Sequence, residues 1–127
     1  MRRWNMLVLT LCLLGLCLVW SDQSDAETCQ GQTTKLTVTG SETITVSTVA
    51  IGFTAANITN AALAIFYVRT APIAYTVAGD TPSATVGFPG PVGTMQGVCD
   101  LAQIKAFKAI RTTGADSSLY VVYYKSP

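Results

Sequence analysis

The stretch SLYVVYYK, residues 118–125, is the part of the chain that decides the fold. Val and Tyr strongly prefer β-strands, and together they fill five of these eight positions. A second apolar run, AALAIFYVR at residues 61–69, has a density of apolar residues that is typical of a central strand covered on both faces. Ala and Leu would also allow a helix at 61–69, but the Ile-Phe-Tyr-Val end favours a strand. Both runs therefore predict strands.

Several shorter segments also have strand character, most of them with the period-two alternation of a half-buried strand. These segments are residues 33–39, 43–51, 73–77, 83–88 and 106–112. Gly40-Ser41 predicts a turn between the first two, and residues 88–97, which contain Pro-Gly-Pro, predict an irregular loop. About six or seven short strands separated by turn signals are typical of a small antiparallel sandwich or barrel. We therefore expect an all-β domain.

Residues 100–111 allow two interpretations. Asp is a good N-cap, so in the first interpretation Asp100 begins one helical turn that runs through Gln103 and is followed by the strand at 106–112. Apolar residues also recur here at every third position, which would suit one longer helix. The residues of that pattern are Leu101, Ile104, Phe107 and Ile110.

The first 26 residues have the three parts of a secretory signal peptide. Arg2 and Arg3 give a positive start, residues 6–20 form an uncharged apolar run, and Ser24-Asp25-Ala26 has the small-x-small pattern of a cleavage site. A transmembrane anchor is the alternative, but it needs roughly 20 apolar residues and this run is shorter. The predicted organisation is a signal helix at 1–26, an arm at 27–32 and one domain at 33–127. We expect an exported protein in the periplasm, outside the cell or on its surface.

The charges of the chain nearly cancel. Eight Lys and Arg residues stand against seven Asp and Glu residues, which gives a net charge of +1 at pH 7. A protein that binds a phosphate backbone needs a basic surface, so nucleic acid is not an expected partner.

Residues suited to catalysis are scarce. The chain contains no His, which is the commonest general base of enzymes. Asp80, Asp100 and Asp116 each lie beside a predicted turn or cap, where hydrogen bonds to the backbone explain an Asp better than catalysis does. A calcium site at Asp80 and Asp116 lacks the spacing of an EF-hand. The sequence therefore predicts no enzyme activity, no cofactor and no metal site.

Two of the four cysteines, Cys29 and Cys99, remain once the signal peptide is removed. In an exported protein such a pair predicts a disulfide. The bridge would close a loop of about 70 residues and contribute about 4 kcal/mol in the chain-entropy model. The alternative is a metal or redox pair, which is disfavoured because neither Cys has a second Cys or a His nearby.

Five side chains are candidates for a protein interface: Arg69, Tyr75, Arg111, Tyr123 and Tyr124. Tyr offers a flat apolar ring with a polar tip, which suits an interface. Tyr123 and Tyr124 are adjacent on a predicted strand, so one of them must face outward, where it either meets a partner or covers a neighbouring strand. Each Arg is either a recognition residue or an ordinary solvent-facing residue at a strand end.

Motifs between Val49 and Lys125 occur in a characteristic order. They are AIGFTAA at 50–56, TAPIAY at 70–75, GDTPSA at 79–84, IKAFKAIR at 104–111 and VVYY at 121–124. In this order they resemble small, mostly uncharacterised proteins from the structural-gene regions of tailed bacteriophages and prophages. Asp-Gly is the usual order in that group where this chain has Gly79-Asp80, and His is common where it has Phe88. The resemblance covers most of the predicted domain and implies a β-sandwich with a structural or decorating role and no active site.

The turn that contains Gly79, Asp80, Thr81 and Pro82 is also similar to a turn of the small Ig-like accessory modules of secreted glycoside hydrolases. Together the resemblances imply an Ig-like or jelly-roll-like sandwich. The expected function is that of a non-enzymatic, phage-virion-like accessory or decoration subunit, which would be virion-associated. The alternative is a secreted module that binds a glycan or a protein receptor. A protein partner or self-assembly is expected, with membrane contact only through an uncleaved signal segment.

Overall fold

The computed structural model describes residues 35–127. The predicted signal peptide, the arm and Cys29 lie outside the described residues. Seven strands and one short helix form within them. They are β1 (Thr37–Val46), β2 (Leu63–Val68), β3 (Ile73–Thr76), β4 (Phe88–Gly90), β5 (Met95–Cys99), α2 (Leu101–Ala106), β6 (Lys108–Arg111) and β7 (Ser117–Lys125).

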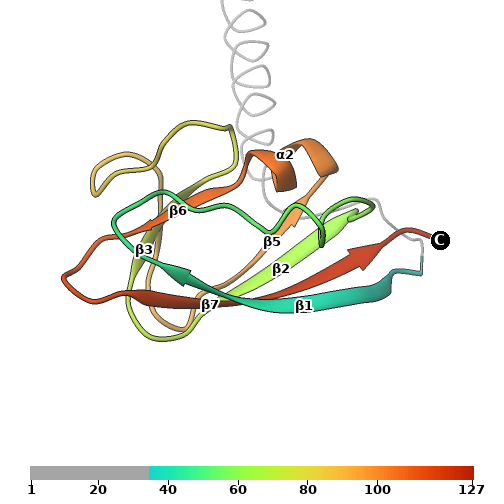
Figure 1. The fold of residues 1–127 in the computed structure, drawn as a ribbon, viewed down its shortest axis with the longest axis horizontal. Helices are drawn as coiled ribbons and strands as arrows, with labels where there is room; N and C mark the ends of the chain where they lie inside the picture. Colours follow the sequence, from blue (N-terminus) through green and yellow to red (C-terminus); the bar gives the residue numbers. More distant parts are fainter. Residues whose placement is uncertain (1–34) are drawn as a thin grey trace, which may run out of the picture.

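The strands form two antiparallel sheets, which are arranged as the layers of a sandwich (Figure 1). The four-stranded sheet has the order β1-β7-β2-β5, and the three-stranded sheet has the order β4-β3-β6. The helix α2 contacts β2 and β5. The prediction of an all-β sandwich is confirmed. Within residues 35–127 no helix has the length and apolar character needed to cross a membrane.

The core lies between the two sheets, and aromatic rings join them. Phe66 of β2 and Tyr75 of β3 belong to different sheets, and their ring centroids lie 5.1 Å apart in an edge-to-face arrangement. Phe107, between α2 and β6, stacks on Phe53 at 4.0 Å and contacts Phe66 at 5.2 Å. Such pairs contribute about 0.5–1.5 kcal/mol each beyond the burial of apolar area. The rings therefore fasten one sheet to the other.

The predicted turn at Gly40-Ser41 is wrong. The chain stays in one strand, β1, whose pairing with β7 shifts register between Val38 and Gly40, which is the mark of a β-bulge. A glycine inside a strand often marks a bulge, and β7 is long enough to pair on both sides of it. The chain therefore passes through Gly40 and Ser41 as a strand, and the irregularity in its pairing lies just before them.

The predicted loop at 88–97 is also wrong, because it contains β4 and most of β5. A tight turn joins these two strands, with the Thr94 N–H donating to the Pro91 carbonyl at 3.0 Å. Proline and glycine are tolerated on edge strands, which explains strands in this composition. The predicted extended segment at 83–88 instead contains a turn, in which Ser83 and Val86 exchange backbone hydrogen bonds at 2.9 and 3.3 Å.

Residues 100–111 follow the first of the two interpretations. Asp100 caps α2, and its carboxylate accepts the Ala102 N–H at 3.2 Å. Phe107 then leaves the helix with φ −57° and ψ 132°, and β6 begins. The single longer helix is wrong because residues 108–111 pair with β3.

The prediction that residues 61–69 are covered on both faces is wrong as well. Ala64, Phe66 and Val68 point into the core and are buried, whereas Leu63, Ile65 and Tyr67 point away from it and are partly or largely exposed. One face of β2 is therefore covered, and its apolar second face reaches the surface.

Candidate interaction surface

The side of the four-stranded sheet that points away from the core is the candidate site, and we call it the outer face. Residues alternate between the two faces of a strand, so the burial pattern and the register together assign its members. The outer face consists of Val38, Ser41, Thr43, Thr45, Leu63, Ile65, Tyr67, Arg69, Met95, Gly97, Cys99, Ser118, Tyr120, Val122 and Tyr124.

The strand register places these side chains in rows across the sheet. One row runs Thr43–Tyr120–Tyr67–Met95, with Tyr120 and Tyr67 directly opposite each other on β7 and β2. The next row runs Ser41–Val122–Ile65–Gly97, and a third runs Val38–Tyr124–Leu63–Cys99. The residues most suited to a contact are therefore neighbours in space, although they come from four separate strands.

The first row keeps much of its surface in contact with solvent. Tyr67 is 41 % exposed, Tyr120 is 42 % exposed and Met95 is 71 % exposed. Scattered apolar side chains are normal on a protein surface, but a contiguous apolar patch marks a site of interaction. Within the outer face Arg69 alone is charged, and it lies one residue beyond β2. The outer face is therefore largely uncharged.

Tyr75 and Tyr123, two of the candidate interface residues, lie in the core. Tyr75 is 6 % exposed and Tyr123 is fully buried, so neither ring offers area to a partner. The expectation that one of two adjacent tyrosines faces outward is met by Tyr124, which is half-buried on the outer face. The interface interpretation of Tyr75 and Tyr123 is therefore corrected.

A polar cluster holds the hydroxyl of Tyr123. Glu42, on the inner side of β1, accepts hydrogen bonds from the Tyr123 hydroxyl, from the Thr54 N–H at 3.0 Å and from the Thr54 hydroxyl at 2.5 Å. Burial raises the pKa of the Glu42 carboxyl, but hydrogen bonds from Thr54, Tyr123 and Asn57 outweigh it, so this pKa lies below its usual value. Burial raises the pKa of the Tyr123 hydroxyl. The hydrogen bond to Glu42 and the negative charge of Glu42 raise this pKa further. The cluster ties β1, β7 and the loop after β1 together.

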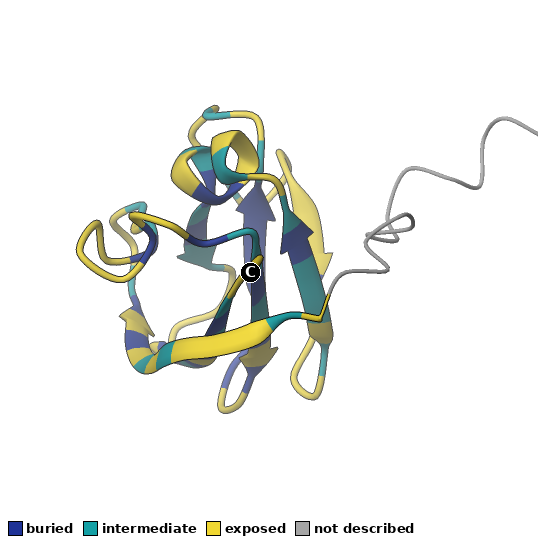
Figure 2. Cartoon of the chain, turned by 90° about the vertical axis from the view of Figure 1, so that its right-hand side faces the viewer, coloured by how far each residue is buried: buried dark blue, intermediate teal, exposed yellow. Residues whose placement is uncertain are grey.

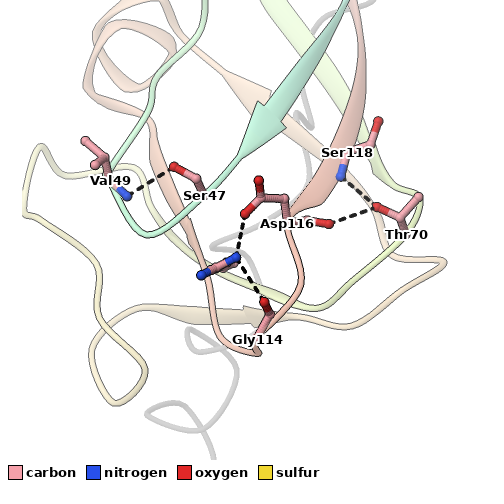
Figure 3. Close-up of polar contacts among 7 residues, drawn as sticks. Ser47, Val49, Thr70, Gly114, Asp116 and Ser118 are labelled. Carbon is pink, nitrogen blue, oxygen red and sulfur yellow. Dashed lines mark hydrogen bonds and ion pairs between the residues drawn. The ribbon is translucent and has the colours of Figure 1, made fainter.

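The two candidate arginines differ in their surroundings. Arg69 is exposed. Its backbone N–H donates to the Ser118 carbonyl at 2.9 Å, and this bond holds the residue beside β7 on the outer face. Arg111 instead donates to the Asp116 carboxylate at 2.6 Å and to the Gly114 carbonyl at 3.1 Å, so its guanidinium braces the loop before β7 (Figure 3). Arg69 belongs to the candidate surface, and Arg111 does not.

The Gly79–Pro82 motif begins at the end of a bend, residues 77–79, that follows β3. Gly79 has φ +90°, a conformation that glycine adopts without strain, and its carbonyl accepts a bond from Lys108 Nζ at 2.7 Å. The Thr76 hydroxyl donates to the Asp80 carbonyl at 2.8 Å. These contacts give the motif a structural role in the fold.

A groove of about 510 Å³ lies over the three-stranded sheet. The described residues that line it carry no ionisable side chain, and Ala74, Pro89 and Pro91 are among them. Residues 35–127 also hold no group of three or more Cys, Asp or Glu side chains placed to bind a metal ion. Neither observation adds a chemical group to the outer face.

The row of Tyr67, Tyr120 and Met95 was not among the candidate interface residues. The alternation within residues 61–69 and 118–125 carries a signal for part of it, because it places Tyr67 on the face of its strand opposite Phe66 and Tyr120 on the face opposite Leu119. Met95 had no such signal, since its strand was not expected. Cys99 ends β5, and its expected partner Cys29 lies outside the described residues, so the disulfide stays a prediction.

Comparison with protein-family models, with curated proteins and with solved structures finds no match to this chain.

Proposed function

We propose that this protein is a non-enzymatic structural subunit that docks on a larger protein assembly through the outer face of its four-stranded sheet. The observation that carries the proposal is the row Tyr120–Tyr67–Met95, which is apolar, contiguous and exposed. Aromatic residues and Met are enriched in the buried centres of protein interfaces, and charged residues are depleted there.

The resemblance to proteins from phage structural-gene regions supports the same role, that of a virion-like accessory or decoration subunit. The order of the motifs carries that resemblance, and three of them fall on β3, β6 and β7. The Ig-like or jelly-roll-like subtype of the sandwich and the export of the chain stay predictions.

The test uses a variant of the outer face that leaves the core untouched. Tyr67→Asp/Met95→Asp places two charges on a directly paired site of β2 and β5. Thr85→Asp/Val86→Asp is the matched control, because it adds the same charge to an exposed loop on the other sheet. Each protein is mixed with the purified products of the neighbouring genes, and binding is measured by co-sedimentation with the assembled particles.

We expect the wild type and the loop control to co-sediment with the particles and the outer-face variant to remain in the supernatant. Thermal melts of all three proteins would show that the variants are folded. Equal binding by the outer-face variant and the control would contradict the proposal, as would the absence of binding by the wild type.

A second candidate is a secreted binding module for a surface glycan. The cross-strand pair Tyr67 and Tyr120 favours it, because two exposed rings side by side make a platform for a sugar. Glycan-array binding by the wild type, lost in Tyr67→Asp/Met95→Asp, would support this candidate. Neighbouring genes for capsid and tail proteins would support the first proposal, and genes for secretion or carbohydrate use would support the second.

A further inference from the structure

Three of the four sheet edges are short or covered. β4 has three residues and carries Pro89, which has no N–H to offer a further strand. β5 has five residues and includes Gly97. β6 has four residues, and the segment after β1 lies against it, with Ile51 and Ala109 exchanging hydrogen bonds at 3.0 and 2.9 Å. These are the features by which proteins keep sheet edges from pairing with other chains.

β1 forms the fourth edge and lacks most of this protection. It has ten residues, and among the described residues β7 is its one neighbouring strand. It contains no Lys, Arg or Pro, and its bulge lies near its start, between Val38 and Gly40. The strand that continues from the grey trace in Figure 2 is mostly exposed. Because every second residue of an edge strand turns its N–H and C=O outward, about five residues of β1 offer free backbone groups.

The one charge on β1 is already engaged. Glu42 accepts its hydrogen bonds from Thr54 and Tyr123 of its own chain, so its carboxylate is held toward the core. The outer-face residues of β1 near Glu42 are Ser41, Thr43 and Thr45, and all three are exposed and uncharged. Thr and Ser side chains can hydrogen-bond to each other when they lie opposite one another in neighbouring strands. This edge is thus complementary to a second copy of itself.

We propose that two copies of this protein pair through antiparallel β1 strands, in a two-fold arrangement centred on Thr43. In this register Thr43 lies opposite the partner's Thr43, and Ser41 lies opposite the partner's Thr45. Glu42 then lies opposite the partner's Ile44, so the two like charges do not face each other directly. A two-fold interface uses the same patch on both copies, which fits a single self-complementary edge.

The pair would join the two four-stranded sheets into one continuous sheet, with two copies of the outer face on the same side. The inference deepens the proposed function, because a docking surface presented twice binds an assembly more tightly than a single one. Its use in docking rests on that function, whereas the pairing itself rests on β1 alone.

Two double variants at the same positions test the pairing and its register. Ser41→Lys/Thr45→Lys places Lys opposite Lys in both halves of the pair. Ser41→Lys/Thr45→Asp places Lys opposite Asp in both halves. Both positions are exposed, so each variant should fold, and thermal melts check this. Sedimentation velocity over about a hundredfold range of concentration measures the dissociation constant of each dimer.

We expect the wild type to dimerise, the Lys/Lys variant to dissociate about tenfold more readily, and the Lys/Asp variant to keep its dimer. Added salt should weaken the Lys/Asp dimer more than the wild-type dimer, because it screens exposed ion pairs. A monomeric wild type would overturn the inference, and so would equal dissociation constants for the two variants.

The outer-face variant Tyr67→Asp/Met95→Asp separates this inference from the proposed function. Its changes lie on β2 and β5, away from β1. We expect it to dimerise like the wild type even though it does not bind the assembly. A dimer lost in this variant and kept in the Lys/Lys variant would place self-association on the outer face and overturn the pairing of β1.

Discussion

The buried hydroxyl of Tyr123 shows how single residues set the position of a strand. A Tyr ring can fill a core only if its hydroxyl finds a partner there, and Glu42 provides one from the neighbouring strand. Thr54 bonds the same carboxylate through both its N–H and its hydroxyl. The loop after β1 is thereby tied to the end of the sandwich at the same point.

Removal of Glu42 should therefore cost more than removal of the hydroxyl that it binds. Glu42→Ala leaves the Tyr123 hydroxyl without its bond, and we expect a loss of about 1–3 kcal/mol in the free energy of unfolding. Tyr123→Phe removes the hydroxyl itself and should cost about 1 kcal/mol. Urea denaturation measures both. Additive costs in the double variant would contradict a direct interaction between the two side chains.

The lowered pKa of Glu42 predicts a loss of stability in acid. An acid whose pKa is lower in the folded state stabilises the fold above its ordinary pKa, here 4.5. That stability disappears as the pH falls through the folded pKa. At pH values below 4.5, the urea midpoint of the wild type should therefore fall more steeply with pH than that of Glu42→Gln, which has no carboxyl at this position. Parallel midpoints for the two proteins between pH 6 and pH 2 would rule out the contribution.

Tyr123 acts in the opposite pH range. Its raised pKa means that the stability from its neutral hydroxyl is present below the ordinary value of 10 and disappears as the pH rises further. The same cluster therefore contributes stability over the whole range between these two limits, where Glu42 is charged and Tyr123 is neutral.

At the scale of the elements, helix α2 depends on Asp100, the residue just before it, for a cap and for a change of chain direction. Asp100 has φ +74°, which disfavours most side chains, and its carboxylate caps the helix. Asp100→Ala loses the cap and keeps the strain, so we expect a cost of about 2 kcal/mol. Asp100→Gly loses the cap and relieves the strain, so its cost should be a few tenths of a kcal/mol. Thermal unfolding of the two variants makes the comparison, and equal costs would contradict this account of the cap.

Local patterns predicted those elements whose faces are set by alternation along a strand. Ile44 and Val46 alternate with polar neighbours, as do Phe107 and Ala109 with Lys108, and all four are buried. β4 and β5 escaped prediction because their strand form depends on partners distant in sequence. Met95, for example, pairs with Tyr67 of β2, and nothing in its own Gly- and Pro-rich segment indicates this. The error at Gly40-Ser41 has a similar cause. Such a pair suits either a turn or a β-bulge, and only the pairing of β1 with β7 decides between them.

The outer face belongs to the scale of the whole molecule. Alternation within β2 and β7 predicts that one side of each strand differs from the other, but it does not say which layers cover them. The three-stranded sheet covers one side of the four-stranded sheet and leaves Tyr67, Tyr120 and Met95 in contact with solvent. The candidate surface therefore follows from the packing of the two layers, which a reading of single segments does not provide.

Cys99 lies at the end of β5, in the same outer-face row as Leu63 and Tyr124. A disulfide with Cys29 would tie the N-terminal arm to this end of the sheet. A domain of about 100 residues has little stability to spare, so the expected gain of about 4 kcal/mol is a large part of the total.

We expect the exported protein to begin at Glu27 and to be lighter by a pair of hydrogens than its reduced form, as measured by intact mass. Cys99→Ser should lower the free energy of unfolding by about 4 kcal/mol, and reductant should lower that of the wild type equally while leaving the variant unchanged. A full-length mass with two free thiols would contradict both the export and the bridge, and would favour a virion protein that assembles without leaving the cytoplasm.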